Sequence, residues 1–199
     1  MPRRADPDLE RRILNAAQKL WKKGGEKALT MRAVARAART TTPTVYQRFP
    51  SRRDILRGLL NRIQRDFIDL IECCDSPQTL ADAYINFAVR HPLEYELFFA
   101  HQDDLFHEVR RKNLPVQQEP RPGVELSKKK LAEWMGGAPE DYVELQLALW
   151  ALAHGTAMLL VSNTARDDSA AELRRATQKA VSVLLDEMAP ATPASRSSR

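Results

Sequence analysis

Apolar side chains recur every three or four residues along most of the chain, and no run alternates apolar and polar residues as a strand would. This spacing predicts an all-α protein of about nine helices. Asp6 and Pro7 supply a cap and a first-turn residue for the first helix, which we expect to end at Gly24–Gly25. Two short helices follow, the first starting at Thr30. Ser51 then opens a fourth helix of about six turns.

The rest of the chain predicts five further helices. They cover residues 77–91, 95–109, 124–135, 139–164 and 169–188. The proline-rich residues 113–123 predict a mobile loop, and the low-complexity tail 190–199 is expected to be disordered. Residues 145–161 are apolar on nearly every side, so we expect protein to cover this helix all round. A membrane span is the weaker alternative, because the run is short for one, contains Gln146 and His154, and lacks a basic flank.

Charge is distributed unevenly along the chain, although the formal net charge is only +5. Residues 1–65 hold 17 Lys and Arg against 5 Asp and Glu, whereas residues 66–199 hold 14 against 21. A basic N-terminal third on an acidic remainder indicates a polyanionic partner for the first part alone. Solvated helix faces are the alternative that charge by itself leaves open.

The stretch ARTTTPTVYQRFPSRRD, residues 38–54, is polar and basic with few core residues. Thr41 or Thr42 caps a short third helix that has Pro43 in its first turn. Two short helices joined by a tight turn and supported by the first helix make a helix-turn-helix. We therefore divide the chain into a helix-turn-helix domain at 1–50, a helical domain at 51–189 and the tail at 190–199.

The outer face of this third helix carries groups that suit nucleic acid. Hydroxyls serve any base, an amide suits adenine, and the carbons of threonine or proline can touch a thymine methyl. The candidates for base edges are Thr42, Pro43, Thr44 and Gln47. The candidates for phosphates are Tyr46, Arg48, Arg52 and Arg53, the last two beside the amides that begin the fourth helix.

Residues 8–60 resemble the DNA-binding domain of the TetR family of transcriptional regulators. The matching pattern is T-M-R-A-V-A-R-A-A and then T-P-T-V-Y-Q-R-F-P-S-R-R-D-I-L, whose Tyr-to-Arg run at 46–52 is the most specific part. The resemblance implies a phosphate contact at Thr30. It also implies DNA contacts at Thr42, Pro43, Thr44, Tyr46, Gln47, Arg48 and Arg52, to which we add Thr41 at the start of the same helix.

Two positions depart from the family pattern. Arg39-Thr40 stands where the family usually has Gly and an apolar residue, and Arg48 stands where it usually has His. A non-glycine residue in a left-handed turn costs on the order of 1 kcal/mol. We expect either that the turn is rearranged or that Arg39 is kept for an additional phosphate contact.

The segments H-P-L-E-Y-E-L-F-F and L-W-A-L-A-H-G-T-A-M-L-L resemble one TetR subgroup, which has Trp-x-x-x-His-Gly in its penultimate helix. Trp150, His154 and Gly155 match that motif. The resemblance implies a C-terminal domain for ligand binding and dimerisation. The candidate ligand-binding residues are Phe67, Tyr84, Phe87, His91, Tyr95, Phe98, Trp134, Trp150, His154 and Met158. Each has a core residue as its alternative role, because aromatics at helical spacing usually pack the core.

The resulting hypothesis is a dimeric, sequence-specific DNA-binding repressor. A hydrophobic or aromatic small molecule would release it from a pseudo-palindromic operator. Small residues on the penultimate helix and an apolar seam on the last one favour a homodimer with a four-helix interface. An architectural DNA-binding protein, a helical enzyme and an activating member of the same family are the alternatives.

Several functions have no support in the sequence. It holds no glycine-rich phosphate loop, no nucleophile motif and no metal-ligand spacing, so we expect neither an enzyme nor a metal or cofactor site. We expect a cytoplasmic protein, because the N-terminus has no apolar signal region and two adjacent cysteines make no disulfide framework. Oxidant sensing by Cys73 and Cys74 is an alternative to a structural role.

Overall fold

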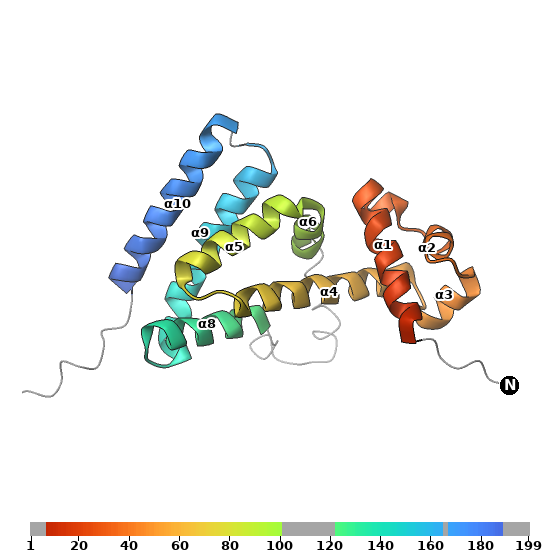
Figure 1. Cartoon of the computed structure of the whole chain (residues 1–199), viewed down its shortest axis with the longest axis horizontal. Coiled ribbons are helices and arrows are strands. Elements are labelled where there is room, and N and C mark those ends of the chain that lie inside the picture. Colours follow the sequence, from red (N-terminus) through yellow and green to blue (C-terminus); the bar gives the residue numbers. More distant parts are fainter. Residues whose placement is uncertain (1–6, 101–121, 165–166, 189–199) are drawn as a thin grey trace, which may run out of the picture. The chain divides into compact units, whose positions relative to one another are not determined.

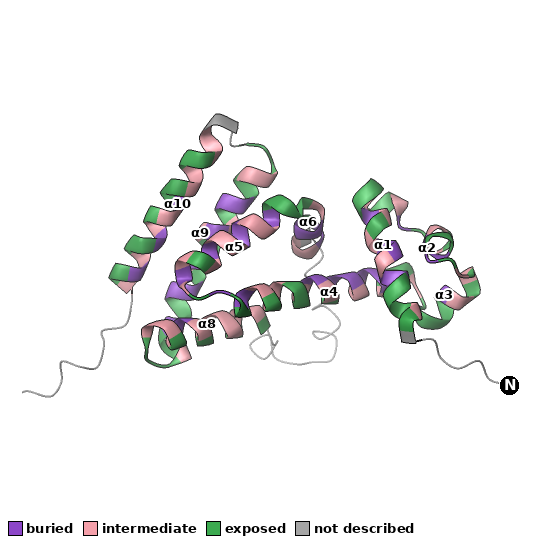
Figure 2. Cartoon of the chain, in the orientation of Figure 1, coloured by how far each residue is buried: buried purple, intermediate pink, exposed green. Residues whose placement is uncertain are grey.

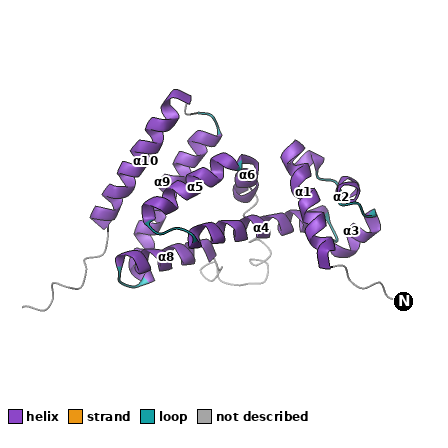
Figure 3. Cartoon of the chain, in the orientation of Figure 1, coloured by secondary structure: helices purple, strands orange, loops and turns teal. Residues whose placement is uncertain are grey.

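The computed structural model describes residues 7–100, 122–164 and 167–188. These residues form nine α-helices and one 3₁₀ helix and contain no strand (Figure 1, Figure 3). The predicted all-α class is therefore confirmed. The chain divides into two compact units, Met1–Gln64 with Glu96–Glu108 and Arg65–Tyr95 with Val109–Arg199.

The first unit contains three helices and the start of a fourth. These are α1 (Pro7–Ala28), α2 (Met31–Ala37), α3 (Thr42–Arg48) and the first part of α4 (Arg52–Glu72); residues 96–100, the end of α6 (Pro92–Ala100), also belong to this unit. Their apolar faces meet in a core in which Ile13, Val34, Val45 and Ile55 are fully buried. The predicted end of the first helix is a kink at Gly24 and Gly25, beyond which one more turn completes α1.

Each helix of this unit after the first begins at a hydroxyl cap. The Thr30 hydroxyl accepts a hydrogen bond from the Ala33 amide at 3.2 Å, and Thr41 caps α3 in the same way. Ser51 accepts from the Asp54 amide at 3.2 Å and donates to the Asp54 carboxylate at 2.7 Å. The caps satisfy amides that would otherwise lack partners, and so they set where each helix starts.

The turn between α2 and α3 has the left-handed geometry that normally selects glycine. Arg39 has φ +54°, its amide donates to the Arg36 carbonyl at 3.2 Å, and the Thr40 amide donates to the Ala35 carbonyl at 2.9 Å. This pair of bonds is a Schellman motif, with Arg39 at the position after the C-cap. The turn is therefore not rearranged around the arginine; Arg39 adopts the conformation instead.

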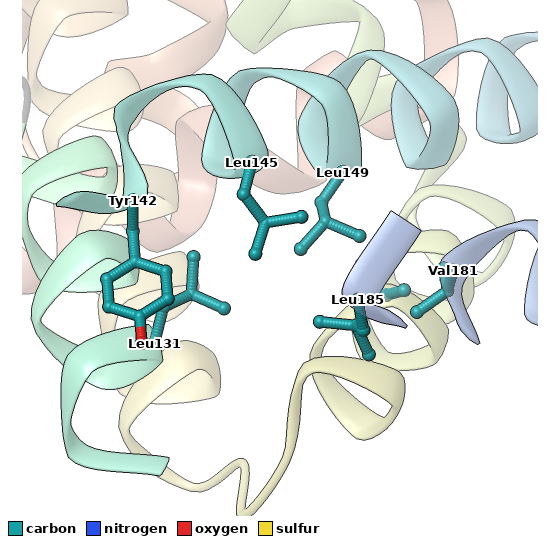
Figure 4. Close-up of a cluster of buried hydrophobic side chains, with 7 residues drawn as sticks. Leu131, Tyr142, Leu145, Leu149, Val181 and Leu185 are labelled. Carbon is teal, nitrogen blue, oxygen red and sulfur yellow. The ribbon is translucent and has the colours of Figure 1, made fainter. Parts of the chain in front are cut away.

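The second unit contains the remaining helices. These are α5 (Pro77–Arg90), the start of α6 (Pro92–Ala100), α8 (Pro122–Met135), the 3₁₀ helix η2 (Pro139–Tyr142), α9 (Val143–Val161) and α10 (Asp167–Met188). Figure 4 shows side chains from α8, η2, α9 and α10 converging on one apolar cluster. Its members are Ala81, Leu131, Tyr142, Leu145, Leu149, Val181 and Leu185. The ring of Tyr142 packs in this cluster, and its hydroxyl donates a hydrogen bond to the Gly136 carbonyl at 2.5 Å.

Some predicted boundaries differ from the structure. The long helix expected over 139–164 is split into η2 and α9, because α-helical geometry begins only at Val143. Pro122, expected in a loop, opens α8, where a proline needs no amide partner. The rest of that loop, the expected extension of α6 beyond Ala100 and the tail lie outside the described residues.

Helix α9 is covered on only part of its circumference. It packs mainly on α5 and α10, and the buried Thr156 and Thr177 hydroxyls bond at 2.8 Å across the contact with α10. An apolar stripe on the opposite side is exposed. Its large members are Val143, Leu147, Met158 and Leu159, and Trp150, also exposed, lies at its edge. A Cβ added at Gly155 would meet no atom within 4 Å, and Figure 2 shows exposed positions along α10 as well.

The expectation that α9 is covered all round is thus not met within one chain. Of the described residues, only Pro139–Val161 is long and apolar enough to cross a membrane, a test that core helices of soluble proteins also pass.

Replacing Arg39 with glycine is expected to stabilise the protein. Glycine adopts φ +54° without strain, so Arg39→Gly should raise the free energy of unfolding by up to about 1 kcal/mol. For a chain of this length the unfolding temperature should rise by roughly 2–4 °C. Arg39→Ala is the matched control, because it removes the charge and keeps the strain. Equal melting temperatures for the two variants would contradict the assignment of strain to this turn.

Candidate functional site

Helix α3 presents a compact reading surface. Val45 is fully buried beneath it, while Pro43, Tyr46 and Gln47 are exposed, Tyr46 to 49%. Tyr46 thus keeps its phenol at the protein surface and not in the core beneath α3. The amide of Gln47 and the phenol of Tyr46 are therefore available to a ligand outside the chain.

The threonines at the start of α3 differ in whether their hydroxyls take part in the helix cap. Thr41 accepts from the Thr44 amide at 3.3 Å, and the two hydroxyls are 2.7 Å apart. Both hydroxyls are thus held by the cap, and both are oriented by it. Thr42 is half-buried in the first turn. Of the predicted base-reading set, Thr42, Pro43 and Gln47 carry side chains that are not part of the cap.

Two of the predicted phosphate-binding arginines are paired with carboxylates of α1. Arg48 Nε lies 3.4 Å from Glu10, and an Arg52 guanidinium nitrogen lies 2.5 Å from Glu26. All four side chains are about half exposed, so each pair contributes no more than about 1 kcal/mol. Replacing either carboxylate by an external anion therefore loses little free energy. Of the remaining candidates, Thr30 caps α2, and Arg53 is exposed in the first turn of α4.

Helix α2 adds two arginines that sequence reasoning did not single out. Arg32 and Arg36 are one turn apart and both exposed, and Arg39 follows them in the turn. No ion pair joins any of the three to another residue in the part of the chain that the structure describes. Helical spacing could have predicted this, because residues 32 and 36 lie on the side of α2 opposite Val34, a core residue, and must therefore face outward.

A second candidate site is a ring cluster in the second unit, built from α4, α5, α6 and α9. Its members are Phe67, Tyr84, Phe87, His91, Tyr95, Trp150 and His154. Phe67 meets the edges of Tyr84 and Phe87 at centroid distances of 5.2 and 5.6 Å. Trp150 stacks on His154 at 5.5 Å with 28° between the planes. Seven of the ten predicted ligand-binding residues thus lie together.

Three polar groups meet within the ring cluster. Tyr95 and Tyr84 place their hydroxyls 2.6 and 3.0 Å from His154 Nδ1, and 3.3 Å from each other. Burial raises the pKa of Tyr95 to about 12 and, with the Tyr95 hydroxyl adding, raises the pKa of Tyr84 further. Burial also lowers the pKa of His154. The hydroxyls stay protonated and the imidazole neutral, so we assign Nδ1 as acceptor and Nε2 as the protonated nitrogen.

The other three predicted ligand-binding residues lie elsewhere. Phe98 pairs with Phe99 at 5.3 Å, in the part of α6 that belongs to the first unit. Trp134 packs on the apolar cluster of Figure 4, with Lys130 Nζ 6.0 Å from its ring centroid. Met158 is on the exposed stripe of α9.

The described residues hold no cluster of metal ligands, and their two cysteines differ in exposure. Among residues 7–100, 122–164 and 167–188, no three His, Cys, Asp or Glu side chains gather as metal ligands would. Cys73 is exposed and Cys74 is buried, its thiol donating to the Leu70 carbonyl at 3.2 Å. Burial raises the pKa of the Cys74 thiol, which disfavours the reactive thiolate.

Two family models match the chain. The model described as bacterial regulatory proteins of the tetR family matches residues 13–59, and that described as the tetracyclin repressor-like C-terminal domain matches residues 78–184. The second model alone covers more than half of the chain. Comparison with curated proteins gives no match.

Solved structures share the fold at low sequence identity. A TetR-family transcriptional regulator from Streptomyces coelicolor is 19% identical, with a TM-score of 0.62 over 90% of this chain and 99% of that one. The multidrug binding protein EbrR in complex with imidazole is 21% identical, with a TM-score of 0.60 over 97% and 96%. A TetR variant from Acinetobacter baumannii AYE in complex with minocycline is 12% identical, with a TM-score of 0.59 over 90% and 97%.

The neutral state of His154 predicts a specific pH dependence of stability. Its folded pKa lies below the unfolded value of about 6.5, so the unfolded chain binds the proton more readily. Stability should fall as the pH drops through the unfolded pKa. His154→Gln should lose less stability than the wild type between about pH 7.5 and 5.5, measured by denaturant unfolding.

Phe67→Leu is the control for this comparison, because it perturbs the same rings without changing a titrating group. An identical loss of stability on acidification for His154→Gln and Phe67→Leu would rule out His154 as the source.

Proposed function

The chain belongs to the TetR family of bacterial regulatory proteins, and we propose that it is a dimeric repressor that a small molecule releases from a pseudo-palindromic operator. It is a DNA-binding transcriptional regulator by family, with a helix-turn-helix in its first unit. The observation that carries the proposal is the exposed face of α3, which offers Tyr46 and Gln47 beside arginines held only by exposed ion pairs.

On DNA, we expect α3 to enter the major groove. Gln47 suits the paired donor and acceptor of an adenine edge, and the Thr42 hydroxyl and Pro43 ring suit neighbouring bases. The expected phosphate contacts come from Thr30, Arg32, Arg36, Arg39, Thr41, Thr44, Tyr46, Arg48 and Arg52. Arg48 and Arg52 would exchange Glu10 and Glu26 for phosphate oxygens as the complex forms.

The exposed stripe of α9 supports a homodimer. Leu147 is 48% exposed, and the open surface at Gly155 would let a second helix approach closely. With the exposed Val183 of α10, two helices from each copy would form a four-helix interface about a two-fold axis. A two-fold dimer reads two inverted half-sites, which is why we expect a pseudo-palindrome.

The ring cluster supports an effector site in the second unit. Phe67, on α4, belongs to the cluster, and Arg52 begins the same helix. An effector that changes the tilt of α4 would change the spacing of the two reading helices, with a coupling free energy of about 1–3 kcal/mol. The relatives in complex with minocycline and imidazole bind ring-containing molecules, in keeping with an aromatic effector here.

We place the protein in the cytoplasm and assign it no cofactor.

Selection of bound duplexes from a random DNA pool by the purified full chain tests the proposal. We expect an inverted repeat to be recovered at physiological salt. Recovery of DNA without a motif would favour an architectural protein, whose affinity depends on salt alone. Control of transcription from a promoter that carries the recovered site would then separate repression from activation.

Gln47 and Arg36 are expected to affect DNA binding in different ways. Gln47→Ala should relax the preference at one position of each half-site, by about 1–3 kcal/mol. Arg36→Ala should weaken binding to all sequences equally and lower the salt slope by about one per subunit. Fluorescence anisotropy with matched and single-substitution duplexes measures both. A uniform loss for Gln47→Ala would contradict its role in reading a base.

Leu147→Glu is expected to separate the dimer. It would place a carboxylate within the proposed apolar interface, where an unpaired charge costs several kcal/mol. Sedimentation velocity should show a monomer, and operator affinity should fall with it. Val89→Glu, at a residue on α5 that is 41% exposed, is the matched control and should remain dimeric. A dimeric Leu147→Glu protein would place the interface elsewhere.

A further inference from the structure

Helix α9 carries a buried amide that has no hydrogen-bond partner among the described residues. Gln146 is 6% exposed, although glutamine is a residue of the surface. Within the described residues no hydrogen bond involves its side chain, whereas Gln178 on α10, half-buried, donates to the Gln78 carbonyl at 3.4 Å. A buried amide without partners destabilises the folded chain, because its hydration is lost and not replaced. Such a group needs a reason beyond packing.

The position of Gln146 on the helix indicates what it serves. Gln146, Trp150 and His154 follow one another at intervals of four residues, so they form one ridge along α9. Trp150 stacks on His154, which is bonded to the two tyrosine hydroxyls. Gln146 thus lies one turn before Trp150 on α9, and about 12 Å along the helix axis separates it from His154.

We propose that Gln146 is the polar anchor of the effector, and that the effector is an uncharged aromatic molecule carrying a hydrogen-bond donor and acceptor of the carboxamide kind. Its polar group would pair with the Gln146 amide, and its ring would lie against Trp150 on the side of the ring cluster. This inference rests on the proposed function, because it specifies the molecule that the second unit binds.

The chemistry of the ridge and the ring cluster favours a neutral ligand. The Gln146 amide, the two hydroxyls and the neutral His154 carry no charge, and a buried ion without a counter-charge would lose its hydration without compensation. Glu94, next to Tyr95 in sequence, is buried as well but already has an interaction of its own. The two half-buried lysines on α8 are paired, Lys128 with Glu125 and Lys130 with Glu133.

Three probes of one shape test the charge preference: benzamide, benzoate and benzamidine. Binding to the full chain would be measured by saturation-transfer NMR titration, with millimolar affinities expected for molecules of this size. We expect benzamide to bind at least roughly tenfold more tightly than either ion. Equal or tighter binding of an ion, or no binding of benzamide, would overturn the inference.

Gln146→Leu separates an anchor from a structural residue. The variant removes an unpaired amide, so the unfolding temperature of the free protein should rise, while the affinity for benzamide should fall roughly tenfold. Gln178→Leu is the matched control; it removes a bonded amide, so the unfolding temperature should not rise and benzamide binding should be unchanged. A lower unfolding temperature with unchanged benzamide binding for Gln146→Leu would show a structural role and refute the anchor.

Failure of this inference differs from failure of the proposed function. Suppose that a charged compound releases the protein from its operator, and that the Gln146→Leu variant responds to this compound as the wild type does. The proposed function as a ligand-responsive regulator would then be supported, and the role of Gln146 as the anchor of a neutral effector would be refuted. If no compound in a diverse library alters operator affinity, the ligand-responsive repressor itself falls.

Discussion

The organisation of the second unit follows from one constraint, namely that the apolar helix α9 has to be covered. One side of it packs on α5 and α10, and its first turns close the apolar cluster with Tyr142 and Leu131. An edge of the same helix supplies His154 and Trp150 to the ring cluster. The side left open is an apolar stripe, for which a second copy is the cover we propose. A single helix is thereby placed in the core, at the proposed effector site and at the proposed dimer interface.

Much of the fold could be predicted because its signals are local. Hydroxyl caps at Thr30, Thr41 and Ser51 depend on neighbours three residues away, and the structure has helices starting at each. The sequence marks Arg39 as a departure from the family pattern, but whether the turn rearranges around it or Arg39 adopts the left-handed conformation is decided only in the folded structure. The split between η2 and α9 was missed, because the apolar spacing runs through both.

The candidate sites could be predicted only in part. Residues that face outward on α3 follow from helical periodicity, but the pairing of Arg48 with Glu10 joins residues far apart in sequence. Likewise Trp134 and Trp150 are both tryptophans within predicted helices, and the sequence does not distinguish their roles. In the structure Trp134 packs on the apolar cluster, whereas Trp150 stacks on His154. The isolated amide of Gln146 could not be foreseen, because whether a partner exists depends on every helix around it.

The ion pairs of Arg48 and Arg52 bear on how such a protein would find its site in a genome. Glu10 and Glu26 compete with phosphate for these two cations, so every contact with random DNA must displace a carboxylate already in place. Each displacement costs no more than about 1 kcal/mol, and it weakens binding to random DNA and to the operator by the same factor. The carboxylates of α1 would thus lower the affinity for DNA of every sequence, so that base contacts make up a larger share of the binding free energy that remains.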